Sequence, residues 1–245
     1  MVRFFRAAVA AFLMLRRAAV RCFWLGMQEC RASAGPPGVD PGSPWYAGAR
    51  GMRRILLARH GQTSWNALGR LQGHTDIELN DVGREQAREL AARLASAELT
   101  AVWASDLARA RQTGEIDAAA LGLAPPTVDP DLRERHYGVF EGLSRDECTA
   151  QHPEAWQDWV AQKGAPPGGE TRPDAAARMA RALDRIAASS GGPVLVVSHG
   201  GVMRLWLMNV LGPSVPIVAN GMTFVIDRDG AGVRAELLAS ATATH

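Results

Sequence analysis

Lysine is almost absent from this chain of 245 residues, in which Lys163 is the only one. A phosphate-binding P-loop needs a lysine in the pattern G-x-x-x-x-G-K-[ST], and that pattern does not occur. A G-x-G-x-x-G turn after a strand, the G-x-S-x-G turn of serine hydrolases and the zinc motif H-E-x-x-H are missing as well. These absences exclude several common nucleotide, hydrolase and metal sites, and they leave arginine as the main cation.

Cysteine is also scarce. Cys22, Cys30 and Cys148 are odd in number and far apart, so they form neither a disulfide framework nor a zinc-binding spacing. Few unpaired cysteines suit a reducing compartment, and we expect the protein in the cytoplasm. Cys148 falls in a predicted helix, where we expect it to pack. The sequence predicts no metal site and no other cofactor.

Most of the chain lacks an excess of positive charge, although its formal net charge is +2. Residues 1–51 contain seven arginines against Glu29 and Asp40, so the remainder must carry a net charge of −3. A basic surface for nucleic acid is therefore not expected. We expect residues 1–51, basic and then rich in proline and glycine, to lie outside the fold, and residues 52–245 to form one domain.

Long apolar runs are missing from the amino-terminal segment. Its longest run, residues 7–15, is far shorter than the ~20 residues that a membrane-spanning helix needs. A signal peptide and a basic helix on a membrane surface are alternatives for residues 1–30 that we do not favour, because arginines follow the run at once. An over-called start, with Met52 as the natural first residue, is an equal alternative.

From Met52 onward, short apolar runs alternate with helical patterns. Strands are predicted at 53–59, 100–105 and 193–198, and a hairpin at 222–239. Helices are predicted at 79–99 (capped by Asp81, with Val82, Ala87, Leu90 and Leu94 at helical spacing), 105–121 (capped by Ser105 or Asp106), 174–189 and 200–212, with one or two short helices within 144–162. This alternation predicts an α/β fold with a largely parallel sheet covered on both faces.

Polar residues follow three of the predicted strands. They are Arg59-His60-Gly61, then Ser105-Asp106 with Arg109 in the next helical turn, and Ser198-His199-Gly200. In parallel sheets, ligands bind at the carboxyl ends of the strands. If the three strands are neighbours, two histidines and two arginines converge at that edge.

Such a cluster suits a phosphate or another oxyanion. Arginine forks bind phosphate oxygens in pairs, and the helix amino termini after Ser105 and His199 offer further N–H donors. Gly61, Gly200 and Gly201 are expected to let the backbone approach the anion closely. Because a neutral imidazole is a competent nucleophile, two histidines beside a phosphate predict phosphoryl transfer.

Phosphoryl transfer to a histidine also needs an acid that protonates the leaving oxygen. Glu134 is a candidate on a predicted loop, and spacing alone does not distinguish it from Glu141. His74 and His136 are expected at the mouth of the site. One histidine after a strand usually has a structural role, so the prediction depends on the repeated pair of histidine and glycine.

Five segments of the chain resemble, in order, the histidine phosphatase superfamily, which includes cofactor-dependent phosphoglycerate mutases. They are LLARHGQTSWN (56–66), LQGHTDIELNDVGREQA (71–87), SDLARARQT (105–113), LRERHYGVFEG (132–142) and VLVVSHGGVMR (194–204), and the likeness covers about residues 53–228. The resemblance implies a three-layer α/β/α sandwich with a mostly parallel central sheet. It also implies a histidine phosphatase-like catalytic domain in residues 52–245 that uses no metal.

The resemblance further implies a role for each matching residue. His60 is the nucleophile that becomes phosphohistidine, and Glu134 is the proton donor and then the base that activates water. The residues implied to hold the phosphoryl group are Arg59, Asn66, Arg109, His199 and Gly200. Those implied to line the substrate entrance are Gln62, Thr63, Gln72 and Gly73.

The implied function is hydrolysis of a small-molecule phosphate ester, with phosphoglycerate mutase-type transfer as the alternative. The mutases of this family carry a longer insertion after the glutamate, with extra basic residues for the substrate carboxylate. Here residues 144–192 hold no adjacent pair of arginines, and the end SATATH is short. These differences favour a phosphatase. A silent phosphate-binding protein is disfavoured because every expected position is filled, and no oligomeric state is implied.

Overall fold

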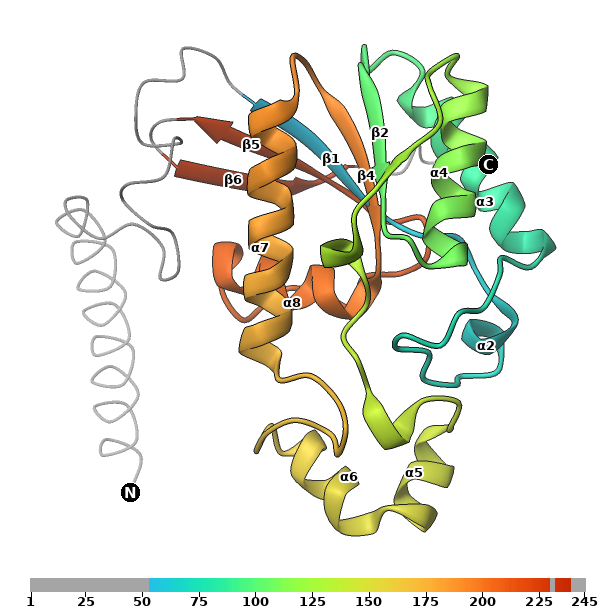
Figure 1. Ribbon diagram of the computed structural model, residues 1–245, viewed down its shortest axis with the longest axis vertical. Coiled ribbons are helices and arrows are strands. Elements are labelled where there is room, and N and C mark those ends of the chain that lie inside the picture. The colour runs from blue at the N-terminus through green and yellow to red at the C-terminus, as the bar shows by residue number, and fades with distance from the viewer. Residues whose placement is uncertain (1–52, 230–231, 239–245) are drawn as a thin grey trace, which may run out of the picture. The chain divides into compact units, whose positions relative to one another are not determined.

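The computed structural model describes residues 53–229 and 232–238. The predictions for residues 1–51, for part of the hairpin turn and for the last seven residues lie outside the described residues. Six strands form one sheet in the order β3-β2-β4-β1-β5-β6 (Figure 1). They are β1 (Arg53–Arg59), β2 (Ala101–Ala104), β3 (Thr127–Val128), β4 (Val194–Ser198), β5 (Thr223–Asp229) and β6 (Gly232–Leu237).

The pairing of the strands confirms the mostly parallel sheet. β1 to β4 are mutually parallel, whereas β5 runs antiparallel to β1 and β6 antiparallel to β5. The predicted carboxyl-terminal hairpin therefore supplies one edge of the sheet. The central strands β1 and β4 are apolar runs that are buried on both faces, which is typical of parallel sheets with helices on each side.

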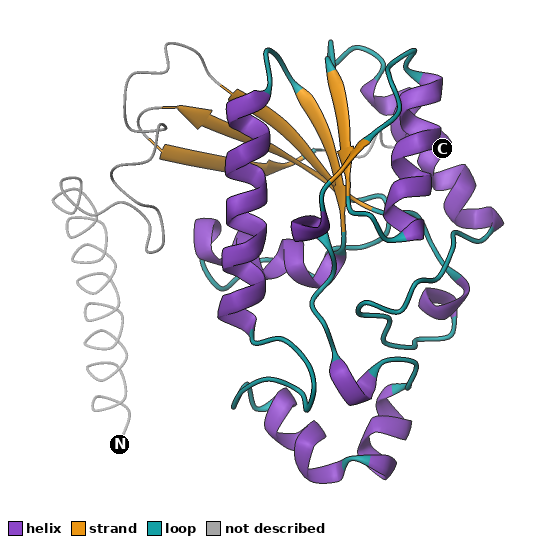
Figure 2. Cartoon of the chain, in the orientation of Figure 1, coloured by secondary structure: helices purple, strands orange, loops and turns teal. Residues whose placement is uncertain are grey.

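Alternate residues of β1 belong to two separate cores. Ile55 and Leu57 pack on one face with helices α7 (Arg172–Ser189) and α8 (Gly200–Leu211). Leu56 and Ala58 pack on the other face with α3 (Asp81–Leu94) and α4 (Ala108–Ala120). Because side chains along a strand point alternately to opposite faces, one strand contributes to both cores. The result is the implied three-layer α/β/α sandwich (Figure 2).

Two short helices, α5 (Arg145–Gln151) and α6 (Pro153–Val160), form a small lobe beyond the carboxyl edge of the sheet (Figure 1). They confirm the one or two short helices predicted within residues 144–162. Phe140 lies edge-on to Trp156, with 5.3 Å between ring centroids, and Trp156 stacks on Trp159 at 4.9 Å. Cys148 is fully buried, which confirms its packing role. Trp156 and Trp159 therefore pack within this lobe.

The predicted helix starts were wrong in detail. Asn80, not Asp81, caps α3, because its side chain accepts the N–H of Gly83 at 2.8 Å. Val82 is exposed rather than part of the apolar face. The α4 helix begins at Ala108, whose N–H donates to Asp76, so a carboxylate from a distant loop replaces the expected local cap.

Small elements were also missed. The strand β3 has two residues, and α2 (Ser64–Ala67) has four, so neither is long enough to show a periodic pattern. Thr63 begins α2, since its hydroxyl accepts the N–H of Asn66 at 3.1 Å. Two 3₁₀ helices, η1 (Pro130–Leu132) and η2 (Gly138–Phe140), are further short elements that were not predicted.

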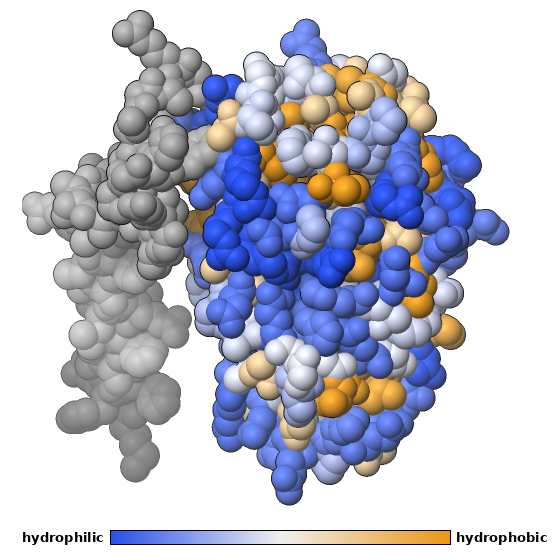
Figure 3. All heavy atoms as spheres, viewed as in Figure 1, coloured by the Kyte–Doolittle hydropathy of each residue, from blue (hydrophilic) through white to orange (hydrophobic). Residues whose placement is uncertain are grey.

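The face shown in Figure 3 is mainly hydrophilic, and its apolar patches are small and separated. Among the residues that the structure describes, no helix has both the length and the apolar character that a membrane crossing requires. The buried apolar residues that the structure describes belong mostly to the two cores.

Two helical glycines differ in the space beside them. A Cβ at Gly83 would lie 2.0 Å from the carbonyl oxygen of Gln62, directly after the strand β1. A Cβ at Gly114 in α4 would lie 3.4 Å from its nearest neighbours, an ordinary contact distance. Alanine is a better helix former than glycine by about 1 kcal/mol, so sterics alone should separate the two sites.

We expect Gly83→Ala to lower the free energy of unfolding by about 1–3 kcal/mol, since overpacking outweighs the gain in helix propensity. The matched variant Gly114→Ala should leave stability unchanged or raise it by up to about 1 kcal/mol. Urea unfolding of both variants measures the difference. A Gly83→Ala protein as stable as the wild type would contradict the tight approach of α3 to the end of β1.

Candidate active site

The register between β1 and β4 brings the two predicted histidines together. Arg59 lies opposite Ser198, and the N–H of His60 donates to the carbonyl of Ser198 at 3.0 Å. The rings of His60 and His199 follow at once, with centroids 5.0 Å apart. The convergence that was inferred from three strand ends is therefore present at the carboxyl edge of the sheet.

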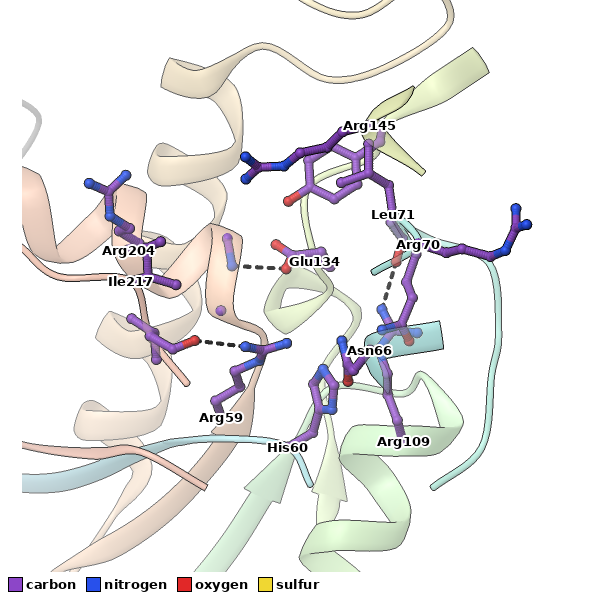
Figure 4. A pocket seen from close by; sticks show the side chains of 16 residues that line it. Arg59, His60, Asn66, Arg70, Leu71, Arg109, Glu134, Arg145, Arg204 and Ile217 are labelled. Atoms are coloured by element: carbon purple, nitrogen blue, oxygen red, sulfur yellow. Dashed lines mark hydrogen bonds between the residues drawn. The ribbon is translucent and has the colours of Figure 1, made fainter. Parts of the chain in front are cut away.

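A cavity of about 300 Å³ opens beside His60 (Figure 4). Five arginines and one carboxylate are among its lining residues, so its charge is strongly positive. Apolar side chains stand at one side, where Ile217 is 76% exposed. The lining residues are Arg59, His60, Asn66, Arg70, Leu71, Gln72, Gly73, Arg109, Glu134, Tyr137, Arg145, Gly200, Gly201, Arg204, Ile217 and Val218.

His60 has the protonation state of a nucleophile. Its Nδ1 lies 2.6 Å from the carbonyl oxygen of Gly61, and a carbonyl only accepts, so Nδ1 carries the proton. The lone pair is then on Nε2. Burial, and then the positive charges of Arg59 and Arg109, hold the pKa of His60 well below its ordinary value of 6.5. The imidazole is therefore neutral at neutral pH.

Arg109 fixes the second histidine in the opposite tautomer. Its Nε donates to Nδ1 of His199 at 3.2 Å, so the proton of His199 is on Nε2. That Nε2 is buried and has no hydrogen-bond partner among the described residues. Burial lowers the pKa of Arg109 to about 10, which leaves the guanidinium charged at neutral pH. Because buried donors are normally hydrogen-bonded, this N–H is suited to bind an anion.

Arg59 and Asn66 complete the group around His60. Nη1 of Arg59 donates to the carbonyl of Val218 at 2.7 Å, while its Nε is buried without a partner in the described part of the chain. Oδ1 of Asn66 accepts from the backbone N–H of Thr63 and from Nδ2 of Asn220, at 3.2 Å each. The amide nitrogen of Asn66 is thereby left for the cavity (Figure 4).

Asn220 was missed in the sequence. Its Nδ2 donates both to the carbonyl of His60 at 3.0 Å and to Asn66, so it supports the backbone of His60 and orients the neighbouring amide. It lies 160 residues after His60 in an irregular loop. No local motif marks such a contact, and only the position just before the predicted strand of the hairpin hinted at it.

The structure distinguishes the two candidate acids. Glu134 lines the cavity, and its carboxylate accepts three backbone N–H groups, from Arg135 at 2.8 Å, Gly201 at 2.9 Å and Val202 at 2.7 Å. Glu141 is absent from the lining of that cavity, and its oxygens are occupied by donors of the loop around Thr75. Of the two, only Glu134 lines the cavity.

The amino termini of α4 and α8 were expected to offer N–H donors to an anion, but donors at both termini bind carboxylates of the protein itself. In α8 the second and third N–H groups, those of Gly201 and Val202, bind Glu134, and the N–H of Ala108 in α4 binds Asp76. Gly61 and Gly201 were likewise expected to let the backbone approach an anion, but both are in close contact with other parts of the protein. A Cβ at Gly61 would strike the carbonyl of Gly83, and a Cβ at Gly201 would lie 2.6 Å from Glu134. These glycines permit contacts within the protein.

The family model for the histidine phosphatase superfamily (branch 1) matches residues 55–236. The chain belongs to the histidine phosphatase superfamily. Its matching segment contains every residue of the cavity described above. The likeness inferred from five short segments thus extends over the whole sheet and its helices.

Curated relatives include both mutase-like proteins and phosphatases. Phosphoglycerate mutase-like protein 4 of Arabidopsis thaliana is 43% identical over 155 residues, 61% of this chain and 67% of that protein. The metal-independent phosphoserine phosphatase of the same plant is 42% identical over 156 residues, 61% and 65% of the two chains. Glucosyl-3-phosphoglycerate phosphatase of Mycolicibacterium vanbaalenii is 39% identical over 175 residues, 66% and 75%. The chain thus spans about two thirds of the first two.

Solved structures show the same fold. YhfR of Bacillus stearothermophilus has a TM-score of 0.69 at 31% identity, over 75% of this chain and 95% of that one. Mycobacterial glucosyl-3-phosphoglycerate phosphatase in complex with VO3 has a TM-score of 0.65 at 32% identity, over 77% and 98%. These likenesses extend over nearly the full length of both neighbours.

The residues that the resemblance assigned to the entrance divide into two pairs. Gln72 and Gly73 line the cavity. Gln62 and Thr63 are outside that lining: the side chain of Gln62 accepts from Asn80 at 2.9 Å, and Thr63 is buried as the cap of α2. His199 also lies behind the lining, fully buried.

His74 and His136 form a ring pair instead of standing at the mouth of the cavity. Their centroids are 4.7 Å apart, and Nε2 of His74 lies 2.8 Å from the carbonyl oxygen of Glu134. His74 therefore supports the backbone at Glu134, and His136 packs against His74. Within residues 53–229 and 232–238, no group of three or more histidine, cysteine or acidic side chains is placed to hold a metal ion.

The neutral state of His60 can be measured directly. We expect NMR titration in phosphate-free buffer to show a ring that remains neutral as the pH falls from 7 through 6.5, because burial and two arginines oppose the imidazolium. Arg59→Gln should raise the pKa of His60, since one positive neighbour is removed. Arg111→Gln, which changes an exposed pair with Glu115, is the control and should leave it unchanged. A half-protonated ring at pH 6.5 in the wild type would contradict this account.

Proposed function

We propose that this histidine phosphatase hydrolyses a small phosphate ester through a phosphohistidine at His60. The observation that carries the proposal is the free Nε2 of a buried, neutral His60, set beside Arg59 and Arg109, neither of which forms an ion pair with a carboxylate of the described residues. The relatives named as phosphatases support hydrolysis as the reaction class. A cavity of about 300 Å³ is at the small end of ligand sites, which suits a small metabolite.

In the first step, Nε2 of His60 forms a bond to phosphorus while the bond from phosphorus to the ester oxygen breaks on the opposite side. Charge on the equatorial oxygens is met by Arg59 and Arg109, by the N–H of His199 and by the amide of Asn66. These donors are fixed before the substrate binds. Gly200, which lines the cavity beside Arg59, completes this group.

Glu134 donates a proton to the leaving oxygen and later accepts one from water. Its Oε1 accepts two N–H groups and its Oε2 only one, so Oε2 keeps an open lone pair that can hold a proton. That proton goes to the leaving oxygen, and the alcohol departs. Water then attacks phosphohistidine, gives a proton to Glu134, and releases phosphate with His60 restored. Acid and base are therefore the same carboxyl group in successive steps.

The names of the relatives suggest what else the substrate carries. Phosphoserine and phosphoglycerate both have a carboxylate near the phosphate. On the cavity lining, Arg70 is already paired with Glu147 at 2.8 Å. Arg145 has no carboxylate partner among the described residues, and Arg204 donates to a backbone carbonyl, that of Val215. We infer that Arg145 and Arg204 receive a second anionic group of the substrate.

The alternative reaction and the location are proposed as follows. Phosphoglycerate mutase-type transfer remains the second candidate, because some relatives carry mutase names. We propose the cytoplasm as the location, since the cysteine of the described residues, Cys148, is a free thiol. The partner that the site accommodates is a small-molecule phosphate ester.

The nucleophile is tested by trapping. Brief incubation with a ³²P-labelled phosphate ester should leave label on His60 that is lost in acid and kept in base, and His60→Ala should lower turnover by about 10³-fold or more. With 3-phosphoglycerate as substrate, phosphate release measures hydrolysis and appearance of the 2-isomer measures mutase activity. A His60→Ala protein with wild-type hydrolysis would overturn the proposal, and isomer formation without phosphate release would favour the mutase.

The second anion site is tested by selectivity. Arg145→Gln should lower kcat/KM for phosphoserine about tenfold, the loss of one charged hydrogen bond, and should change it less than about twofold for p-nitrophenyl phosphate, which has no carboxylate. Arg181→Gln, an exposed arginine on α7, controls for the loss of one positive charge. Equal losses with both esters would show that Arg145 does not recognise a second anion.

A further inference from the structure

Glu141 is a nearly buried carboxylate that takes no direct part in the proposed reaction. Its side chain is 12% exposed, and it follows η2 in the segment that begins with Glu134. Oε1 accepts the N–H groups of His74 at 2.9 Å and Tyr137 at 3.0 Å. Oε2 accepts the N–H and the hydroxyl of Thr75, at 2.9 and 2.8 Å. One side chain thus joins two segments of the site more than 60 residues apart.

The loop that Glu141 holds is the loop that fixes Arg109. Nη2 of Arg109 donates to the carbonyl of Gly73 at 2.7 Å, and Nη1 donates to the carbonyl of Thr75 at 2.9 Å. Glu141 binds the N–H groups of this turn, and Arg109 binds its carbonyl groups. The turn therefore connects the carboxylate directly to the guanidinium, and Nε of Arg109 continues the connection to His199.

The fit around Glu141 is close. A Cβ at Gly73 would lie 2.0 Å from Oε1 of Glu141, and Gly73 has a positive φ of 54°, which side-chain-bearing residues rarely adopt. Burial alone would raise the pKa of Glu141, but the bonds from His74, Thr75 and Tyr137 outweigh it and lower the pKa. The group is therefore an ionised carboxylate at neutral pH.

We propose that Glu141 is a positioning residue for phosphoryl binding: it shapes the turn at residues 73–75 so that its carbonyl groups orient the guanidinium of Arg109 and, through it, the N–H of His199. This deepens the proposed function and rests on it, since it explains how Arg109 is oriented without a carboxylate bound to its guanidinium. A carboxylate paired directly with Arg109 would neutralise the charge that the phosphate needs. Glu141 acts instead through the backbone of the turn.

A glutamine cannot replace this carboxylate. All four partners of Glu141 donate hydrogens, and an amide NH₂ would face donors on one side. Glu141→Gln should therefore distort the turn and misplace Arg109, whereas Glu141→Asp keeps the charge but shortens the reach and should be affected less. Glu115→Gln, at an exposed glutamate of α4, is the matched control.

The experiment is a double-mutant cycle of Glu141→Gln with Arg109→Lys. Two quantities are measured: kcat/KM for p-nitrophenyl phosphate and the affinity for orthovanadate. Glu141→Gln alone should lower both about tenfold and should raise the pKa of His60 little, while Glu115→Gln lowers neither. Because Glu141 acts through Arg109, the double variant should lose hardly more than Arg109→Lys alone. Thermal unfolding followed by circular dichroism separates these losses from a loss of fold.

Several results would overturn the inference. They are additive losses in the cycle, or a Glu141→Gln protein within about twofold of the wild type in vanadate affinity. If Glu141→Gln does not fold, the cycle is repeated with Glu141→Asp, whose smaller loss should likewise be non-additive with that of Arg109→Lys, and additive losses there would overturn the inference. A wild-type protein that binds vanadate but hydrolyses no ester would instead overturn the proposed function, and the affinity cycle would still test Glu141.

Discussion

The parallel pairing of β1 with β4, in the register that sets Arg59 beside Ser198, is the constraint on which the site depends. It makes the two strands end together, so His60 and His199 emerge side by side at one edge. A slip of one residue would turn every side chain of β1 to the other face and exchange its two core sets. The burial of Ile55 and Leu57 on one face, and of Leu56 and Ala58 on the other, therefore also fixes the chemistry.

The arginines that the structure describes differ in their acceptors. Many outside the cavity pair with carboxylates, such as Arg133 with Asp106 at 2.5 Å and Arg178 with Glu170 at 2.7 Å. The two beside His60 bind neutral acceptors instead. Arg59 donates to a backbone carbonyl, and Arg109 donates to two carbonyls and an imidazole. Their charge is oriented without being neutralised, so it is available to a phosphoryl group and it also keeps His60 neutral.

The features predictable from the sequence were local ones. Apolar runs that end in Arg-His-Gly and Ser-His-Gly showed the strands, their ends and the anion chemistry, because each pattern lies within ten residues. Local sequence could not distinguish Glu134 from Glu141, because the distinction depends on which carboxylate faces the cavity. Only the resemblance to a family indicated Glu134. The contacts of Asn220 with His60 and of Glu141 with Thr75 join residues 160 and 66 positions apart. No pattern of nearby residues encodes such contacts.

The helix amino termini show why a correct physical rule led to an incorrect assignment. Helix termini do attract anions, but here internal carboxylates occupy the ends of both α4 and α8. At α8 this places the carboxylate of Glu134 on the lining of the same cavity as Arg59 and Arg109. The arrangement suits a reaction in which the phosphoryl charge and the leaving oxygen need different partners: cations hold the first, and a carboxyl held by a helix terminus serves the second. Gly201 is required for this position of Glu134, because a Cβ there would lie 2.6 Å from the carboxylate.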